Sequence, residues 1–291
     1  MSKYPMLSSL NKTKEETKQL KKIKKSQQQE FKRILKRMLK QFSDEEKDSI
    51  DFSCHQLTNF PVSGILSGDV LNFWRNLEKI DLSRNQLKTL PKEFSKLNIT
   101  HLQLQHNKFE TLPPVILKIE TLRYLGLDYN LLKSIPDKIS NLEDLFGLSL
   151  NHNKFRQFPK EVCKLQTLYW LSLENNEIQS IPDEIVNLET LQYLYIRQNF
   201  IISVPKLFFS LERLKGVYLS DNLIEHIPSG ITKCFSLSVL TLDQNMIRAL
   251  PQDLIKFEFD YLDISNNRLK KKPDGLRSLV LLDSGNLYSN L

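Results

Sequence analysis

Five histidines and three cysteines are the residues of this chain that could ligate a metal ion or pair a nucleophile with a base. Zinc needs several such ligands around one ion, and nucleophilic catalysis needs a base within hydrogen-bond reach. His106 and His152 are 46 residues apart, which is two periods of the chain's repeat and a separation of roughly 10 Å. Cys54 and His55 are adjacent, so their side chains point to opposite faces of an extended segment. We therefore predict no catalytic site, no metal and no cofactor.

The elements that position these side chains come from an internal repeat. Asparagine recurs every 22 or 23 residues, and a proline follows each one six residues later. Apolar residues lie three, five and eight positions before each asparagine, and the positions between them vary. This alternation predicts one short strand with a buried face in every repeat, and stacked repeats form a solenoid with a continuous core.

The repeated asparagines are predicted to be structural. An amide side chain both accepts and donates hydrogen bonds, so it can pair buried turn groups of its own coil and of the neighbouring coil. The proline suits the first turn of a short helix or 3₁₀ turn on the return path. The predicted asparagine ladder comprises Asn85, Asn107, Asn130, Asn153, Asn176, Asn199, Asn222, Asn245 and Asn267.

Aromatic residues gather on the predicted exposed face of the sheet, at the positions two, four and six before each asparagine. Four of them fall in three successive coils, and Gly147 and Gly216 in the flanking coils predict shallow gaps for a partner's side chains. The alternative is that these rings only cover one another on a sheet surface. We favour a protein-binding site, because exposed contiguous aromatic area is typical of interfaces. Its predicted residues are Tyr124, Asp128, Trp170, Glu174, Tyr193, Tyr195, Arg197 and Tyr218.

Residues 1–42 form a basic tail with 13 Lys or Arg against three Glu, whereas residues 43–291 carry a net charge of −3. The solenoid is therefore no basic cradle for nucleic acid. Apolar residues at helical spacing predict an amphipathic helix over about 29–42. The helix could cap the first coil, contact an anionic membrane or calmodulin-like partner, or serve nuclear targeting or nucleic acid. Its basic face comprises Lys32, Arg33, Lys36, Arg37 and Lys40.

The two ends of the array depart from the repeat. His55 occupies the asparagine position of the first coil, and the insertion 62–76 predicts a longer helical return that places Trp74 in the core. Segment 276–283 predicts a final strand. We therefore expect one solenoid of about ten coils over 43–291, with a cap at each end.

The repeat resembles the leucine-rich repeat family, in the 23-residue class typical of Ras-binding and Ras-suppressor proteins, and residues 145–167 show it well. The resemblance covers about 47–283 and implies an α/β horseshoe: a parallel concave sheet with short helices or 3₁₀ turns on the convex side. The exposed aromatic residues predict an intracellular adaptor or scaffold that binds a protein on the concave face, and the resemblance implies small-GTPase or phosphatase signalling as its setting. The alternative is a membrane- or calmodulin-recruited protein acting through residues 31–42.

The expected compartment is the cytoplasm, with the nucleus as the alternative. No cysteine cluster flanks the array, and the N-terminus lacks the apolar run of a signal peptide. No small-molecule substrate is expected, because an open repeat array presents a surface instead of an enclosed pocket.

Overall fold

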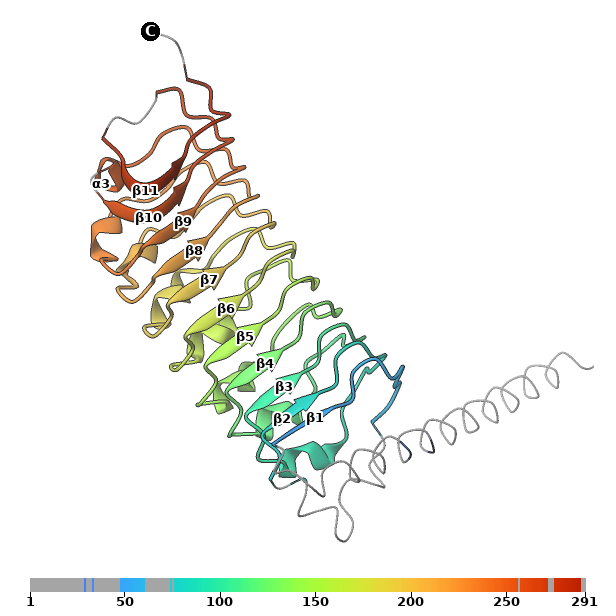
Figure 1. The fold of residues 1–291 in the computed structure, drawn as a ribbon. Coiled ribbons are helices and arrows are strands. Elements are labelled where there is room, and N and C mark those ends of the chain that lie inside the picture. The colour runs from blue at the N-terminus through green and yellow to red at the C-terminus, as the bar shows by residue number, and fades with distance from the viewer. Residues whose placement is uncertain are drawn as a thin grey trace, which may run out of the picture.

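One parallel sheet runs the length of the solenoid. The computed structural model describes residues 29, 33, 48–60, 74, 76–255, 257–271 and 275–288. In these residues eleven strands pair in chain order, and each crossover between neighbours is one coil (Figure 1). The strands are β1 Ser49–Asp51, β2 Lys79–Asp81, β3 His101–Gln103, β4 Tyr124–Gly126, β5 Gly147–Ser149, β6 Trp170–Ser172, β7 Tyr193–Tyr195, β8 Gly216–Tyr218, β9 Val239–Thr241, β10 Glu258–Asp263 and β11 Arg277–Leu282.

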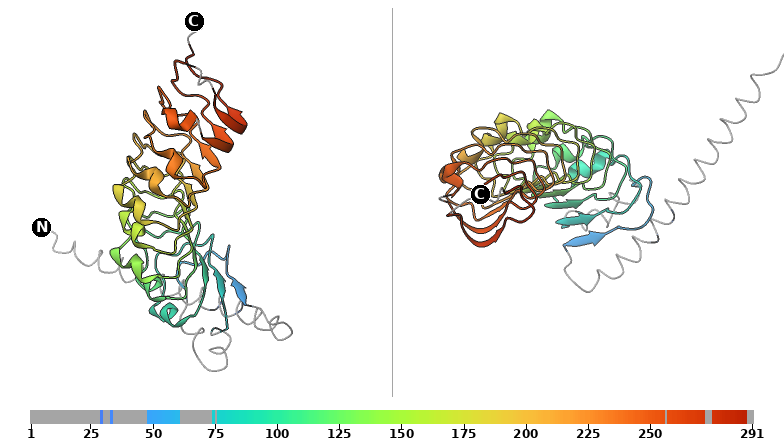
Figure 2. Two further views of the ribbon diagram at one scale, coloured as in Figure 1. Left: turned by 90° about the vertical axis from the view of Figure 1, so that its left-hand side faces the viewer. Right: turned by 90° about the horizontal axis from the view of Figure 1, so that it is seen from above.

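Short helices lie across the core from the sheet, on the return path of the coils (Figure 2). The repeated proline starts several of them, as predicted. The carbonyl oxygen of Pro91, for example, accepts a bond of 3.1 Å from the backbone N–H of Phe94. The helices are η3 Lys92–Lys96, η4 Ile116–Lys118, η5 Asp137–Asn141, η6 Lys160–Lys164, η7 Asp183–Asn187, η8 Phe208–Ser210, η9 Ile231–Lys233 and α3 Gln252–Ile255.

A single hydrophobic core fills the space between sheet and helices. In every regular coil the residues eight, five and three before the asparagine and two after it are buried, as are Leu191, Leu194, Ile196 and Ile201 in the coil of β7. These side chains belong to one continuous cluster. The predicted solenoid with a parallel concave sheet and convex 3₁₀ turns is therefore confirmed.

The ladder asparagines are buried and bond from coil to coil. The Oδ1 atom of Asn153 accepts the backbone N–H of Leu132 in the preceding coil at 3.0 Å. Its Nδ2 atom donates to Leu127 O of that coil at 2.9 Å and to Leu150 O of its own coil at 3.1 Å. Each regular coil repeats this pattern, so the side chains satisfy backbone groups that the turns would otherwise leave unpaired.

The ladder has a tenth member that the spacing did not reveal. The Oδ1 atom of Asn286 accepts Leu269 N at 3.2 Å, and its Nδ2 atom donates to Ile264 O at 3.0 Å and Asp283 O at 2.9 Å. Asn286 follows Asn267 by only 19 residues, because the last return path is shorter. The strand predicted at 276–283 is confirmed as β11.

The first coil closes on a cluster of aromatic rings. Phe52 stacks on Trp74 with ring centroids 6.2 Å apart, and Phe60 meets both Phe52 and Phe94 edge-on at 5.6 and 5.0 Å. Trp74 is fully buried, as predicted. His55 does not take the asparagine's role, because its side chain contacts its own turn through Ser53 O.

The basic tail and the insertion fall mostly outside the described residues. Gln29 and Arg33 are the described residues of the tail, and both are helical and exposed. The division into a tail over 1–42 and a solenoid over 43–291 stays a prediction. Within the described ranges, no helix combines the length and apolar character needed to cross a membrane.

Candidate functional site: the concave aromatic patch

The histidines and cysteines are dispersed. His106 and His152 stand on either side of Tyr129, whose ring stacks on theirs at 4.1 and 3.9 Å. All three have a positive φ of 51–54°, an uncommon conformation for residues other than glycine. Burial raises the pKa of the Cys163 and Cys234 thiols to about 12. No group of three or more His, Cys, Asp or Glu in the described ranges could hold a metal ion.

Aromatic rings contact one another across neighbouring strands on the concave face. Tyr124 of β4 lies 6.1 Å from Trp170 of β6, ring centroid to ring centroid, across Gly147 of β5. Trp170 meets Tyr195 of β7 at 6.0 Å, and Tyr195 stacks on Tyr218 of β8 at 4.4 Å with an interplanar angle of 4°. All four rings are half-buried. The strand register therefore brings the predicted aromatic residues together on one surface.

Two further rings extend this surface at the residue before each strand. Phe146 stacks on Tyr169 at 4.5 Å, and Tyr169 lies 5.6 Å from Tyr193, the register partner of Trp170. Phe146 is 52% exposed. The sequence prediction omitted both residues because it sampled only the positions two, four and six before each asparagine; position seven carries the signal. The aromatic patch comprises Tyr124, Phe146, Tyr169, Trp170, Tyr193, Tyr195 and Tyr218.

The shallow gaps expected at Gly147 and Gly216 are not open. A methyl group at Gly147 would lie 3.2 Å from Tyr124 Cδ2 and 3.4 Å from Trp170 Cε3. At Gly216 it would lie 2.9 Å from Tyr193 Cδ1. Both glycines are buried, because neighbouring rings lean into the space that their missing side chains leave. The prediction of insertion gaps was wrong, and the rings form a continuous cover instead.

The polar residues predicted beside the patch already have partners within the sheet. Asp128 accepts hydrogen bonds from Ser149 Oγ and from the backbone N–H of Asn151. Burial raises the pKa of the Asp128 carboxyl, although both bonds oppose that shift. Arg197 Nε donates to Glu174 Oε1 at 2.6 Å, and this bond raises the pKa of the Arg197 guanidinium. These side chains stiffen the surface next to the patch.

An acidic hollow of about 570 Å³ adjoins the patch on the C-terminal side. Arg197 and Tyr218 line it together with three carboxylates. Burial raises the pKa of the Asp221 carboxyl, and the neighbouring charge of Asp243 adds to the rise. Sequence reasoning missed the hollow because its carboxylates come from different positions of three coils. They are Asp221, Asp243 and Asp263.

Comparisons with known proteins place this architecture. Among solved structures, a leucine-rich repeat protein of Leptospira interrogans shares 28% identity and a TM-score of 0.67, over 84% of this chain and 68% of that one. The repeat ectodomain of the Arabidopsis thaliana receptor kinase GASSHO1/SCHENGEN3, solved in complex with Casparian strip integrity factor 2, shares 31% identity and a TM-score of 0.61. The alignment covers 75% of this chain but only 26% of that ectodomain.

A Listeria monocytogenes internalin shares the fold at 22% identity and a TM-score of 0.52, over 76% of this chain and 78% of that one. A search of curated proteins found no match. Two family models do match: one described as leucine-rich repeat covers residues 66–109 and 98–155, and one described as leucine-rich repeat region covers 159–256. Together with the asparagine ladder and the parallel sheet, these matches show that the chain belongs to the leucine-rich repeat family.

Proposed function

We propose that this protein is an adaptor that binds a protein partner on its concave face, with the aromatic patch as the contact surface. The observation that supports the proposal most directly is the chain of ring contacts from Tyr124 on β4, through Trp170 on β6 and Tyr195 on β7, to Tyr218 on β8. Tyrosine and tryptophan dominate binding hot spots because they bury large area and lose little conformational entropy. Leucine-rich repeat modules are typically non-enzymatic and offer extended surfaces for recognition.

The rigidity of the patch favours binding. Asp128 and Glu174 are held by hydrogen bonds and an ion pair to neighbouring coils. The rings are anchored in strands of three residues whose intervening positions are core. A partner would therefore meet a surface that needs little ordering, and preorganisation lowers the free-energy cost of association.

A scaffold role in intracellular signalling forms part of this proposal. Its support is the sequence resemblance to Ras-suppressor-type repeats, which residues 145–167 of this chain show well. The receptor ectodomain at 31% identity was solved in complex with Casparian strip integrity factor 2, which agrees with a binding role for the present array.

The test compares two double variants as bait in an extract of the native cells. Trp170→Ala with Tyr195→Ala removes the centre of the patch, and we expect it to lose partners that the wild-type chain captures. Leu207→Ala with Phe235→Ala truncates two exposed apolar residues on the return path and should retain them. Mass spectrometry would identify the captured proteins. Each would then be purified, and its affinity for the wild type and for both double variants would be measured by titration. Equal affinities for the patch variant and the wild type would contradict the proposal.

The recruitment alternative depends on residues 31–42, of which the structure describes Arg33 alone. It is supported by the tail's 13 Lys or Arg against three Glu. Deleting residues 1–42 separates it from a capping role: a large fall in melting temperature indicates a cap, whereas an unchanged melting temperature with lost vesicle or calmodulin binding indicates recruitment.

A further inference from the structure

A second surface follows the strands, on the side where the chain turns at the asparagines. Its residues lie one and three positions after each of the nine ladder asparagines from Asn85 to Asn267, and we call them the turn edge. None of them is buried, whereas the residue between them is buried in every coil. The backbone N–H at the first position donates to the preceding coil with bonds of 2.8–2.9 Å, as Phe200 N does to Ile178 O. The turn edge is therefore a rigid row of outward side chains, one step per coil.

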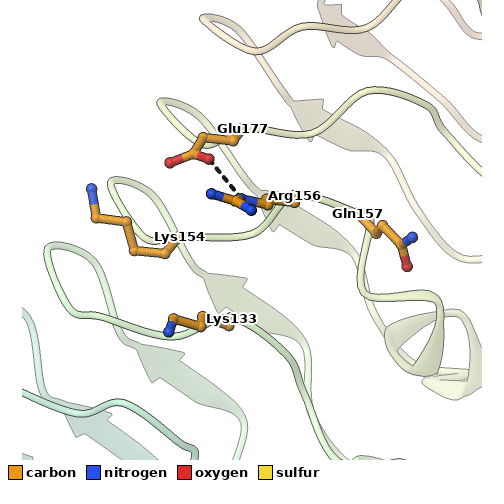
Figure 3. Close-up of a pocket in the computed structure, with 5 residues that line it drawn as sticks. All are labelled: Lys133, Lys154, Arg156, Gln157 and Glu177. Carbon is orange, nitrogen blue, oxygen red and sulfur yellow. Dashed lines mark hydrogen bonds and ion pairs between the residues drawn. The ribbon is translucent and has the colours of Figure 1, made fainter.

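The turn edge is basic although the rest of the solenoid is acidic. It carries eight Lys or Arg and three Glu, a net charge of +5, whereas the remaining residues of 43–291 carry −8. Arg156 pairs with Glu177 of the next turn at 3.1 Å, while Lys154 extends from the same turn as Arg156 and Lys133 from the preceding turn (Figure 3). A shallow hollow of about 420 Å³ lies among these side chains, and the residues that line it are all charged or polar types. Basic residues recur further along the row at Arg248, Arg268 and Lys270.

Apolar side chains protrude between the two basic stretches. Phe200 and Ile202 come from one turn and Leu223 from the next, and they are 51%, 56% and 37% exposed. Leu131 is a single exposed apolar residue at the equivalent position between Lys108 and Lys154. A monomeric protein rarely exposes such residues together without a use for them.

We propose that the turn edge docks on the surface of an anionic lipid bilayer, with Phe200, Ile202 and Leu223 entering the headgroup region. Charge complementarity supports the lipid, because the basic stretches on either side of the apolar side chains are both attracted to anionic headgroups. Shape favours lipid over a peptide. The apolar residues project outward from turns, and the hollow beside them is lined by charged and polar residues. This arrangement suits insertion into a headgroup layer better than it suits reception of a peptide's apolar side chains. This contact lies on a different side of the strands from the aromatic patch.

The test is sedimentation of the full chain with vesicles of phosphatidylcholine containing 30% phosphatidylserine, and with phosphatidylcholine alone. We expect binding to the anionic vesicles that weakens as salt rises. Phe200→Gln with Ile202→Gln should reduce the partition coefficient roughly tenfold. Lys133→Glu with Lys154→Glu should reduce it by about tenfold or more at low salt.

Matched controls, all of which keep the basic tail, separate the turn edge from general effects of charge and apolar area. Leu207→Gln with Phe235→Gln removes equally exposed apolar residues from the return path, and Lys160→Glu with Lys233→Glu makes the same charge change on η6 and η9. Both controls should have partition coefficients within twofold of the wild-type value, and circular dichroism would verify that every variant is folded. Absence of binding, or equal losses in edge and control variants, would overturn the proposal. Edge variants that bind vesicles normally but lose a protein partner would replace lipid by protein as the occupant.

Discussion

The asparagine ladder and the aromatic patch share coils of the solenoid, but they differ in how often they repeat. The ladder places the same side chain in the same buried position coil after coil, and each amide bonds both its own coil and the preceding one. The patch uses different residues at several positions and is confined to β4–β8 and the residues that precede them. A feature that every coil needs holds the solenoid together, whereas a feature of a few coils is available for recognition.

The largest effect that separates these regions should come from the middle of the ladder. Asn153→Ala leaves Leu132 N and three carbonyl oxygens without their side-chain partner. At about 1–3 kcal/mol for each buried group left unpaired, we expect a loss of roughly 3–5 kcal/mol in the free energy of unfolding. Urea denaturation followed by circular dichroism measures it.

Two other asparagines provide controls for that loss. Asn286→Ala removes a part-buried ladder member at the C-terminal end and should cost about 1 kcal/mol. Asn141→Ala changes an exposed residue at the end of η5 and should cost less than about 0.5 kcal/mol. Similar losses for all three variants would show that the ladder is no more important than any surface amide.

The interior was predictable from the sequence because each coil imposes the same physical constraint. Leu191, Leu194 and Ile196 occupy positions whose spacing directs them to the core. The buried turn that follows has backbone groups that water does not reach, so an amide side chain must pair with them. Asn286 escaped because the last return path is shorter, although its chemistry is the same. The period of the repeat therefore identified the nine evenly spaced ladder asparagines, but it could not identify one that falls at a different spacing.

The surface was predictable only in part. Strand register determines the face from which a side chain projects, but packing against its neighbours determines the conformation that the side chain adopts. The register of Trp170 and Tyr195 placed them on one face. It could not show that Tyr193 and Tyr218 would lean over Gly216, since that depends on side-chain rotamers. Nor could it show that Phe146 would join the patch by stacking on Tyr169.

A smaller effect should arise where the patch covers its glycines. Gly216→Ala places a methyl group 2.9 Å from Tyr193 Cδ1 and 3.1 Å from Tyr218 Cε2. Overpacking costs about 1–3 kcal/mol and reduced freedom of the unfolded chain returns about 0.4–1 kcal/mol, so we expect a net loss of roughly 1 kcal/mol. The contacts at Gly147 are longer, at 3.2 and 3.4 Å, so Gly147→Ala should be nearly neutral. Equal effects on unfolding would contradict ring cover at Gly216.

The smallest effect should appear in alkaline solution, where the patch titrates and the amides of the ladder do not. Burial, and then the neighbouring Tyr218, raise the pKa of the Tyr195 hydroxyl above its ordinary value of 10.0. The unfolded chain therefore ionises first. The stability that this hydroxyl contributes is present below about pH 10 and is lost as pH rises through the raised pKa. Tyr195→Phe keeps the stacked ring, so its free energy of unfolding should fall less steeply than that of the wild type between pH 9 and 11. The two chains should show no such difference in slope between pH 7 and 8, and parallel curves above pH 9 would mean that Tyr195 titrates as it does in the unfolded chain.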